Sequence, residues 1–116
     1  MPADEVIFHL TTPGEWDAAR TTGQVVPAGF AAEGFVHCST VTQLLGTIER
    51  HFADAEELCL LQLDGTSLAD ALRWEEGRPG EIYPHVYRPI RVAEVVRVVR
   101  WQRGEDGSAG LPPEIA

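Results

Sequence analysis

The sequence predicts one small domain of mixed α+β class, built around one sheet with flanking helices. The chain has 116 residues, enough for one hydrophobic core and too few for two independent ones. Short apolar segments typical of strands are separated by segments with helical spacing, and no internal repeat is present. We expect residues 1–103 to form the domain. The small, acidic, proline-containing segment 104–116 is predicted to be a disordered tail.

The first elements are predicted by local signals. Residues 5–10 are predicted to form a short apolar strand. Thr12 and Glu15 have the spacing of a capping box around a proline at the first helical position, so a helix begins here and stops near Gly23. Residues 24–32 contain a proline and a glycine, which favours a loop or a weak edge strand.

A strand over residues 35–38 leads into the clearest helix of the chain. Ser39 is expected to cap this helix. Its apolar positions follow helical spacing at Val41, Leu44, Leu45, Ile48 and Phe52.

Strand signals dominate the second half of the chain. The nearly continuous apolar run 58–63 predicts a central strand covered on both faces, and the valine-rich run 90–101 favours another strand. Between them, residues 66–72 can form one or two helical turns. The charged, glycine-containing stretch 73–80 suggests an exposed loop or a lid.

Charge and composition exclude several classes of partner. The net charge is −9 at pH 7 and every basic residue is an arginine, so the surface should repel nucleic acids and anionic membranes in general. The chain lacks an apolar run of about 20 residues and a signal-peptide start, so we expect a cytoplasmic protein. Cys38 and Cys59 lie in apolar segments, and we expect reduced, buried thiols on adjacent strands.

Three of the four histidines, His9, His37 and His85, end apolar segments and are candidates for one pocket. Strand alternation separates Cys38 from His37, which disfavours a cysteine nucleophile. A metal site on the three histidines with Glu33 or Glu81 stays open, although no local ligand spacing supports it and we assign no metal ligand. Histidines that simply satisfy core hydrogen bonds are the other alternative.

Three motifs in order resemble a known family. FHLTT, then EGFVHCST followed by Gln43, then EIYPHVYRPI are similar to the signature of the bacterial family called domain of unknown function 952, over residues 6–101. That family is more remotely similar to the ADP-ribosyltransferase superfamily, which includes RNA 2'-phosphotransferases. The resemblance implies a bent, mixed or antiparallel sheet, split around a central cleft that clamps NAD.

The resemblance also implies roles for particular residues. His9 and Thr11 match a first-strand motif that holds the NAD ribose and the nicotinamide amide. Phe35 matches an aromatic that packs on the nicotinamide ring, and Ser39 a serine that precedes a helix. The superfamily's third motif is a glutamate, and Glu81 comes nearest to it in chain order.

We therefore expect an NAD-dependent or related nucleotide-binding protein, and an ADP-ribosyl or phosphate transferase if it is an enzyme. Tyr87 joins Phe35 in packing the base, and His37 or His85 supplies a general acid, a general base or a stabilising hydrogen bond, with Glu81 as the catalytic carboxylate. Two alternatives stay open, a noncatalytic metabolite-binding module and a hydrolase or metal enzyme built on the histidines. The sequence does not predict an oligomeric state.

Overall fold

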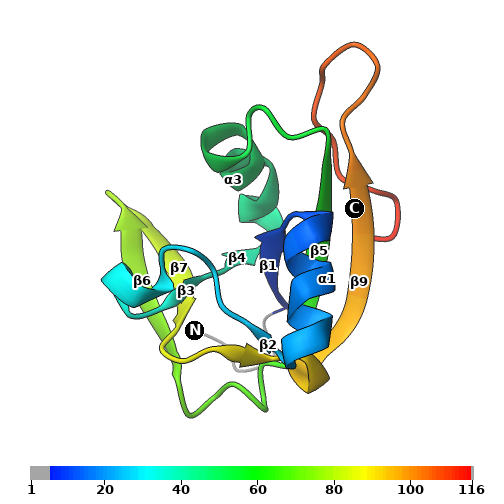
Figure 1. Cartoon of the computed structure of the whole chain (residues 1–116). Helices are drawn as coiled ribbons and strands as arrows, with labels where there is room; N and C mark the ends of the chain where they lie inside the picture. Colours follow the sequence, from blue (N-terminus) through cyan, green and yellow to red (C-terminus); the bar gives the residue numbers. More distant parts are fainter. Residues whose placement is uncertain (1–5, 116) are drawn as a thin grey trace.

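Two antiparallel sheets part along residues 36–40, which we call the crossing strand because residues 36–37 pair in one sheet and residues 39–40 in the other (Figure 1). The structure, a computed structural model, describes residues 6–115. Residues 1–5 and 116, which belong to the expected domain and tail, lie outside the described residues. Within the described part the chain is a small single-domain α+β fold, which confirms the expected class. None of its helices is long and apolar enough to cross a bilayer.

The larger sheet has four strands in the order β4-β1-β5-β9. Its strands are β4 (Ser39–Thr40), β1 (Ile7–Thr11), β5 (Glu57–Leu63) and β9 (Val95–Gln102). Every pairing in it is antiparallel, and β5 is central and buried on both faces, as its continuous apolar run predicts.

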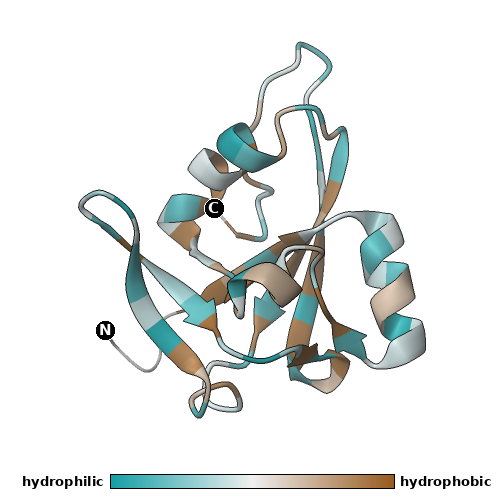
Figure 2. Cartoon of the chain, turned by 60° about the vertical axis from the view of Figure 1, so that its left-hand side comes forward, coloured by the Kyte–Doolittle hydropathy of each residue, from teal (hydrophilic) through white to brown (hydrophobic). Residues whose placement is uncertain are grey.

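The smaller sheet has three strands in the order β3-β7-β6. They are β3 (Val36–His37), β7 (Glu81–Val86) and β6 (Leu72–Arg78). The expectation of a loop or lid over residues 73–80 is therefore wrong for most of that stretch. β6 is the edge strand of this sheet and pairs with β7, so its charged side chains lie at a partly solvent-exposed edge. The β6–β7 hairpin is largely hydrophilic toward its tip (Figure 2).

A short two-stranded sheet joins β2 (Gln24–Val25) to β8 (Ile90–Arg91). The predicted strand over residues 90–101 is thus interrupted by the 3-10 turn η2 (Val92–Glu94). The interruption has a local cause: the buried Glu94 carboxylate accepts the backbone N–H of Arg91 at 2.9 Å and closes a capping box.

The helices confirm most of the local signals. α1 (Pro13–Thr22) has the predicted Thr12–Glu15 capping box and ends at Gly23, whose φ of 88° suits glycine. Short α2 (Phe30–Glu33) follows, and the 3-10 turn η1 (Val41–Gln43) leads into α3 (Leu44–His51).

Two expectations about helices are wrong. Thr40 rather than Ser39 begins the turn before α3, because Gln43 completes a capping box with Thr40, while Ser39 lies in β4 and shares a hydrogen bond of 2.9 Å with Thr47. Residues 66–71 form a series of hydrogen-bonded turns and no helix, and Leu72 begins β6.

Hydrophobic side chains pack into two clusters on the two faces of the four-stranded sheet. On β1, Ile7 belongs to the first cluster with Trp16 of α1, and Phe8 to the second with Ile48 of α3. The first cluster also contains Val36 and therefore joins the two sheets.

Residues 104–115, which we expected to be a disordered tail, lie against the second cluster. Ala109, Leu111 and Ile115 pack on it, and Trp101 Nε1 donates to the Gly110 carbonyl at 2.9 Å. This segment therefore contributes apolar contacts to the domain.

Both cysteines are free and buried, as expected. Burial raises the pKa of each thiol. The expectation of adjacent strands is wrong, because Cys59 is on β5, Cys38 lies between β3 and β4, and β1 separates β4 from β5.

Candidate functional site

The candidate site lies where the two sheets part, around the peptide that joins His37 to Cys38. On one side, Cys38 N–H donates to the Pro84 carbonyl of β7 at 3.1 Å. On the other side, the His37 carbonyl accepts a hydrogen bond of 2.8 Å from Nδ1 of His9 on β1. A side chain of one sheet thus bonds the backbone of the other sheet at the fork.

This hydrogen bond fixes the state of the His9 imidazole. A carbonyl oxygen can only accept, so Nδ1 carries the proton. Burial lowers the pKa of His9, with smaller opposing effects of the His37 carbonyl and of Glu15. His9 is therefore neutral at pH 7, and its Nε2 atom offers a lone pair.

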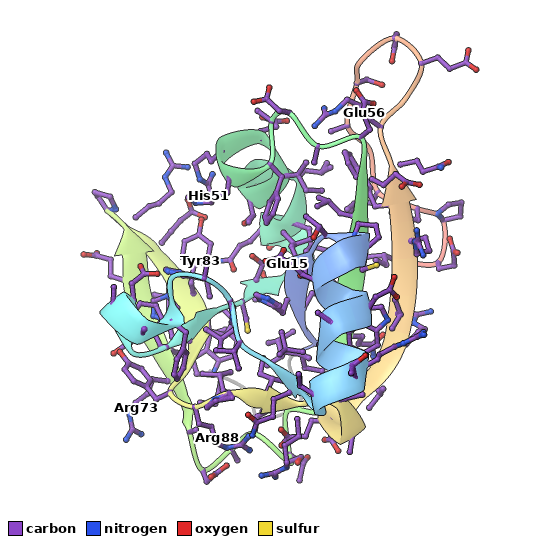
Figure 3. All side chains as sticks on the ribbon, in the orientation of Figure 1. Glu15, His51, Glu56, Arg73, Tyr83 and Arg88 are labelled. Atoms are coloured by element: carbon purple, nitrogen blue, oxygen red, sulfur yellow. The ribbon has the colours of Figure 1, made fainter. Side chains whose placement is uncertain are left out.

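A cavity of about 430 Å³ lies beside α1 and is lined by His9, Thr11 and Glu15. Its volume falls within the range of small-molecule sites. Thr11 Oγ1 donates to Glu15 Oε1 at 3.1 Å, so its lone pairs face outward from that bond. Partial burial opposes ionisation of Glu15, yet hydrogen bonds from Thr12 and Thr11 hold its pKa below the usual value. Figure 3 shows Glu15 near the N-terminal end of α1, toward the centre of the molecule.

A cluster of aromatic rings covers one face of β3 and β7, with His85 buried and His37 exposed. We call it the ring cluster; its members are Phe35, His37, His85 and Tyr87. Phe35 stacks on His85 with ring centroids 4.2 Å apart, and lies 4.7 Å from His37 and 5.2 Å from Tyr87. The two imidazoles lie 5.3 Å apart in an edge arrangement. Four of the predicted site residues are thus brought together.

Each imidazole of the ring cluster is bonded to a carboxylate. His85 Nδ1 lies 2.8 Å from Glu75 Oε1, which also accepts a hydrogen bond of 2.6 Å from the Tyr87 hydroxyl. Both hydrogen bonds lower the pKa of Glu75, and the bond from Tyr87 has the larger effect. His37 Nε2 lies 2.8 Å from Glu33 Oε2. Sequence reasoning missed two carboxylates of the site: Glu75, because β6 was interpreted as a solvated loop, and Glu15, which was assigned only to the helix cap.

The structure places the three histidines in two neighbouring groups: His37 and His85 lie in the ring cluster, and His9 lines the cavity beside α1. On β1, His9 shares the face of Ile7, which packs in the first hydrophobic cluster, whereas His37 alternates with Val36 and Cys38 of that same cluster. His9 and Thr11 line the cavity beside α1, whose lining includes no member of the ring cluster, and His9 contacts that cluster through the His37 carbonyl.

Two further predicted residues lie away from both groups. Ser39 is buried against α3 through Thr47. Glu81 begins β7, where it accepts Tyr83 OH at 3.1 Å and pairs with Arg78 at 3.6 Å. Figure 3 shows Tyr83 on the side of β7 that faces α3. Glu81 precedes His85 by four strand positions, a distance of about 13 Å along β7.

Metal binding by three protein ligands has no support in the described residues, among which no three His, Cys, Asp or Glu side chains gather in a suitable group. Within residues 6–115, His9, His37 and His85 therefore do not form the three-histidine metal site that the sequence left open.

Comparisons with known proteins identify the family but no activity. The sequence model of the proteins of unknown function DUF952 matches residues 10–98. The chain is similar to the X-ray crystal structure of protein CC0527 from Caulobacter crescentus, with 33% identity, a TM-score of 0.86, and coverage of 95% of this chain and 97% of that one. The solution NMR structure of CC0527 gives 34% identity, a TM-score of 0.82, and coverage of 96% and 97%. No protein of curated function matches the chain.

Proposed function

The chain belongs to the DUF952 family of proteins of unknown function, and we propose that it binds NAD or a related nucleotide through the ribosyl-nicotinamide end. The observation that carries this proposal is the set of hydrogen-bond acceptors around the cavity beside α1. Nε2 of neutral His9, the Thr11 hydroxyl and the Glu15 carboxylate all present lone pairs.

Such a set suits a ligand that brings donors and positive charge. A ribose offers two vicinal hydroxyl donors, a carboxamide offers two N–H donors, and an oxidised nicotinamide ring is cationic. A phosphate group brings only acceptors and negative charge, and Glu15 repels it. The acceptor set therefore favours the ribosyl-nicotinamide end of the nucleotide over its diphosphate.

The split between the two sheets supports the same proposal. An ADP-ribosyltransferase-like fold has a cleft where two sheets separate, and here the His9 to His37 hydrogen bond lies at such a separation. In the proposal Phe35 and Tyr87 provide an aromatic surface for the base, which requires the nucleotide to extend from the cavity past the His37 carbonyl. Loss of affinity in Phe35→Leu tests this extension, because Leu keeps the apolar bulk and removes the ring.

Calorimetric titration with four compounds tests the proposal. We expect NAD and nicotinamide mononucleotide to bind, ADP-ribose to bind more weakly because it lacks the cationic ring, and inorganic phosphate not to bind. A titration in which NAD and nicotinamide mononucleotide fail to bind at millimolar concentration contradicts the proposal.

Matched variants locate the binding. His9→Asn keeps a donor near the position of Nδ1 and removes Nε2, and Thr11→Val removes the hydroxyl. Each loses one hydrogen bond worth about 0.5–1.5 kcal/mol, so affinity should fall roughly two- to tenfold. His51→Gln and Thr21→Val, at exposed positions, are the controls and should bind as the parent does. Unchanged affinity in both test variants contradicts the proposed site.

Turnover is a separate question, and Glu81 is its sharpest test. Glu81 lies with Tyr83 and Arg78 at the start of β7, away from the cavity lined by His9. Nicotinamide release that survives Glu81→Gln would show that this carboxylate is not catalytic. Binding of NAD without nicotinamide release would favour a noncatalytic nucleotide-binding module.

A further inference from the structure

The paired imidazoles of His37 and His85 form an arrangement that the nucleotide proposal does not use. Their residues lie directly opposite each other on β3 and β7. Because Cys38 N–H bonds to Pro84 O, His37 and His85 form a pair without mutual backbone hydrogen bonds, the kind in which side chains approach most closely. We propose that this pair is a two-histidine chelate for a late first-row divalent cation such as Cu²⁺, Ni²⁺ or Zn²⁺.

The spacing of the rings fits such a chelate. Two imidazoles on one tetrahedral metal, with metal to nitrogen bonds of about 2.0–2.1 Å, place their ring centroids about 5 Å apart. The centroids of His37 and His85 are 5.3 Å apart, with the planes inclined at 78°. Phe35 stacks on His85 at 4.2 Å and shields one face of that ring from water.

The outer hydrogen bonds are those of a metal-binding pair. A histidine that binds a metal commonly donates its second ring nitrogen to a carboxylate, which orients the ring and makes it a better ligand. Glu75 takes Nδ1 of His85 and Glu33 takes Nε2 of His37, which leaves one ring nitrogen of each imidazole for the metal. Arg73 lies opposite His85 on β6 and brings one positive charge near the pair. The two negative charges of Glu75 and Glu33 exceed it, so the local charge favours a cation.

The ligand set predicts which ions bind. Imidazole suits late transition metals, whose affinity follows the order Cu²⁺ above Ni²⁺ and Zn²⁺, whereas Mg²⁺ and Ca²⁺ prefer oxygen ligands. Within residues 6–115 no third protein ligand completes a group with the two histidines, so water or a substrate atom fills the remaining positions.

Titration of the metal-stripped full chain with Cu²⁺, followed by visible absorption, tests this site, with Ni²⁺, Zn²⁺ and Mg²⁺ followed by calorimetry. We expect one Cu²⁺ per chain, weaker Ni²⁺ and Zn²⁺ binding and no Mg²⁺ binding. Glu75→Gln should weaken Cu²⁺ binding about 10- to 100-fold through its outer hydrogen bond, and His37→Gln should weaken it further. The His37 side chain is 59% exposed, so His37→Gln folds even if substitution of buried His85 does not.

His51→Gln, at an exposed position, is the control and should keep full Cu²⁺ affinity. Undiminished Cu²⁺ binding in His37→Gln, loss of binding in His51→Gln, or no binding to the parent chain overturns the proposal. The proposal does not rest on nucleotide binding, because the Cu²⁺ titration contains no nucleotide and its ligands are the His37 and His85 imidazoles.

Discussion

Glu94 offers the most quantitative test of the fold, because its buried carboxylate joins the corner before β9 to the turn after β5. The side chain is 3% exposed. Arg88 donates Nη1 to Oε1 at 2.9 Å and Nη2 to Oε2 at 2.8 Å, and Ser67 Oγ donates to Oε2 at 2.6 Å. Hydrogen bonds from Arg88 are the main reason that the pKa of Glu94 falls from 4.5 to about 2. Figure 3 shows Arg88 at the lower end of the molecule, remote from Glu15.

The drop in pKa gives the expected cost of neutralising this group. Each tenfold change in the acid constant is worth about 1.4 kcal/mol, so the drop corresponds to about 3 kcal/mol of stability at pH 7. Removing one partner of a buried ion pair costs about 3–5 kcal/mol, and Arg88 retains Asp70 at 3.2 Å, which places the cost at the lower end. We therefore expect Glu94→Gln to lower the free energy of unfolding by about 3 kcal/mol.

The pH dependence follows from the direction of the pKa change. A carboxylate with a lowered pKa in the folded state stabilises fully above its unfolded pKa of 4.5, and this stabilisation is lost as the pH falls toward 2. The free energies of unfolding of the parent and of Glu94→Gln, measured by urea denaturation, should therefore differ by a constant amount between pH 5.5 and pH 8. The two values should converge as the pH falls toward 2. The exposed Glu49→Gln is the control. A difference below about 0.5 kcal/mol at pH 7, or one that persists in acid, would refute the reasoning.

Three further predictions concern packing. Cys38 and Cys59 should react slowly with a thiol reagent until the protein unfolds, and rapid labelling of the native protein would contradict their burial. Gly77→Ala should destabilise the fold by about 1–3 kcal/mol in urea denaturation, because the new Cβ would lie 2.7 Å from the buried Tyr83 ring; an unchanged midpoint would contradict this. Trp101→Phe removes the hydrogen bond to the C-terminal segment, costs about 0.5–1.5 kcal/mol, and should speed proteolysis within residues 104–115; equal cleavage rates would count against the packed segment.

Elements with local signals are predictable from this sequence. The capping box before α1 involves residues three apart, and the apolar run of β5 needs no partner to be recognised. β6 is different, because its charged side belongs to an edge strand and resembles a loop until its pairing with β7 is known. The turn before α3 shows a third case: Ser39 and Thr40 are both good caps, and only Gln43 decides between them.

The same distinction applies to the candidate site. Strand alternation predicts that Phe35 and His37 share a face, and the structure brings their rings to 4.7 Å. Alternation within each strand cannot predict that His9 bonds the His37 carbonyl, since that contact depends on where the two sheets part. Glu75 escaped notice because its partner His85 becomes its neighbour only through the β6–β7 hairpin.

The most direct test of the proposed cavity is the ring-nitrogen spectrum of His9, recorded by ¹⁵N–¹H correlation with and without nicotinamide mononucleotide. We predict a neutral ring protonated at Nδ1 at pH 7, held so by burial and by the His37 carbonyl. Addition of the ligand should shift Nε2 of His9 and leave His51 unchanged. A His9 ring protonated at Nε2, or an Nε2 signal that does not move at saturating ligand, would contradict the proposed acceptor site.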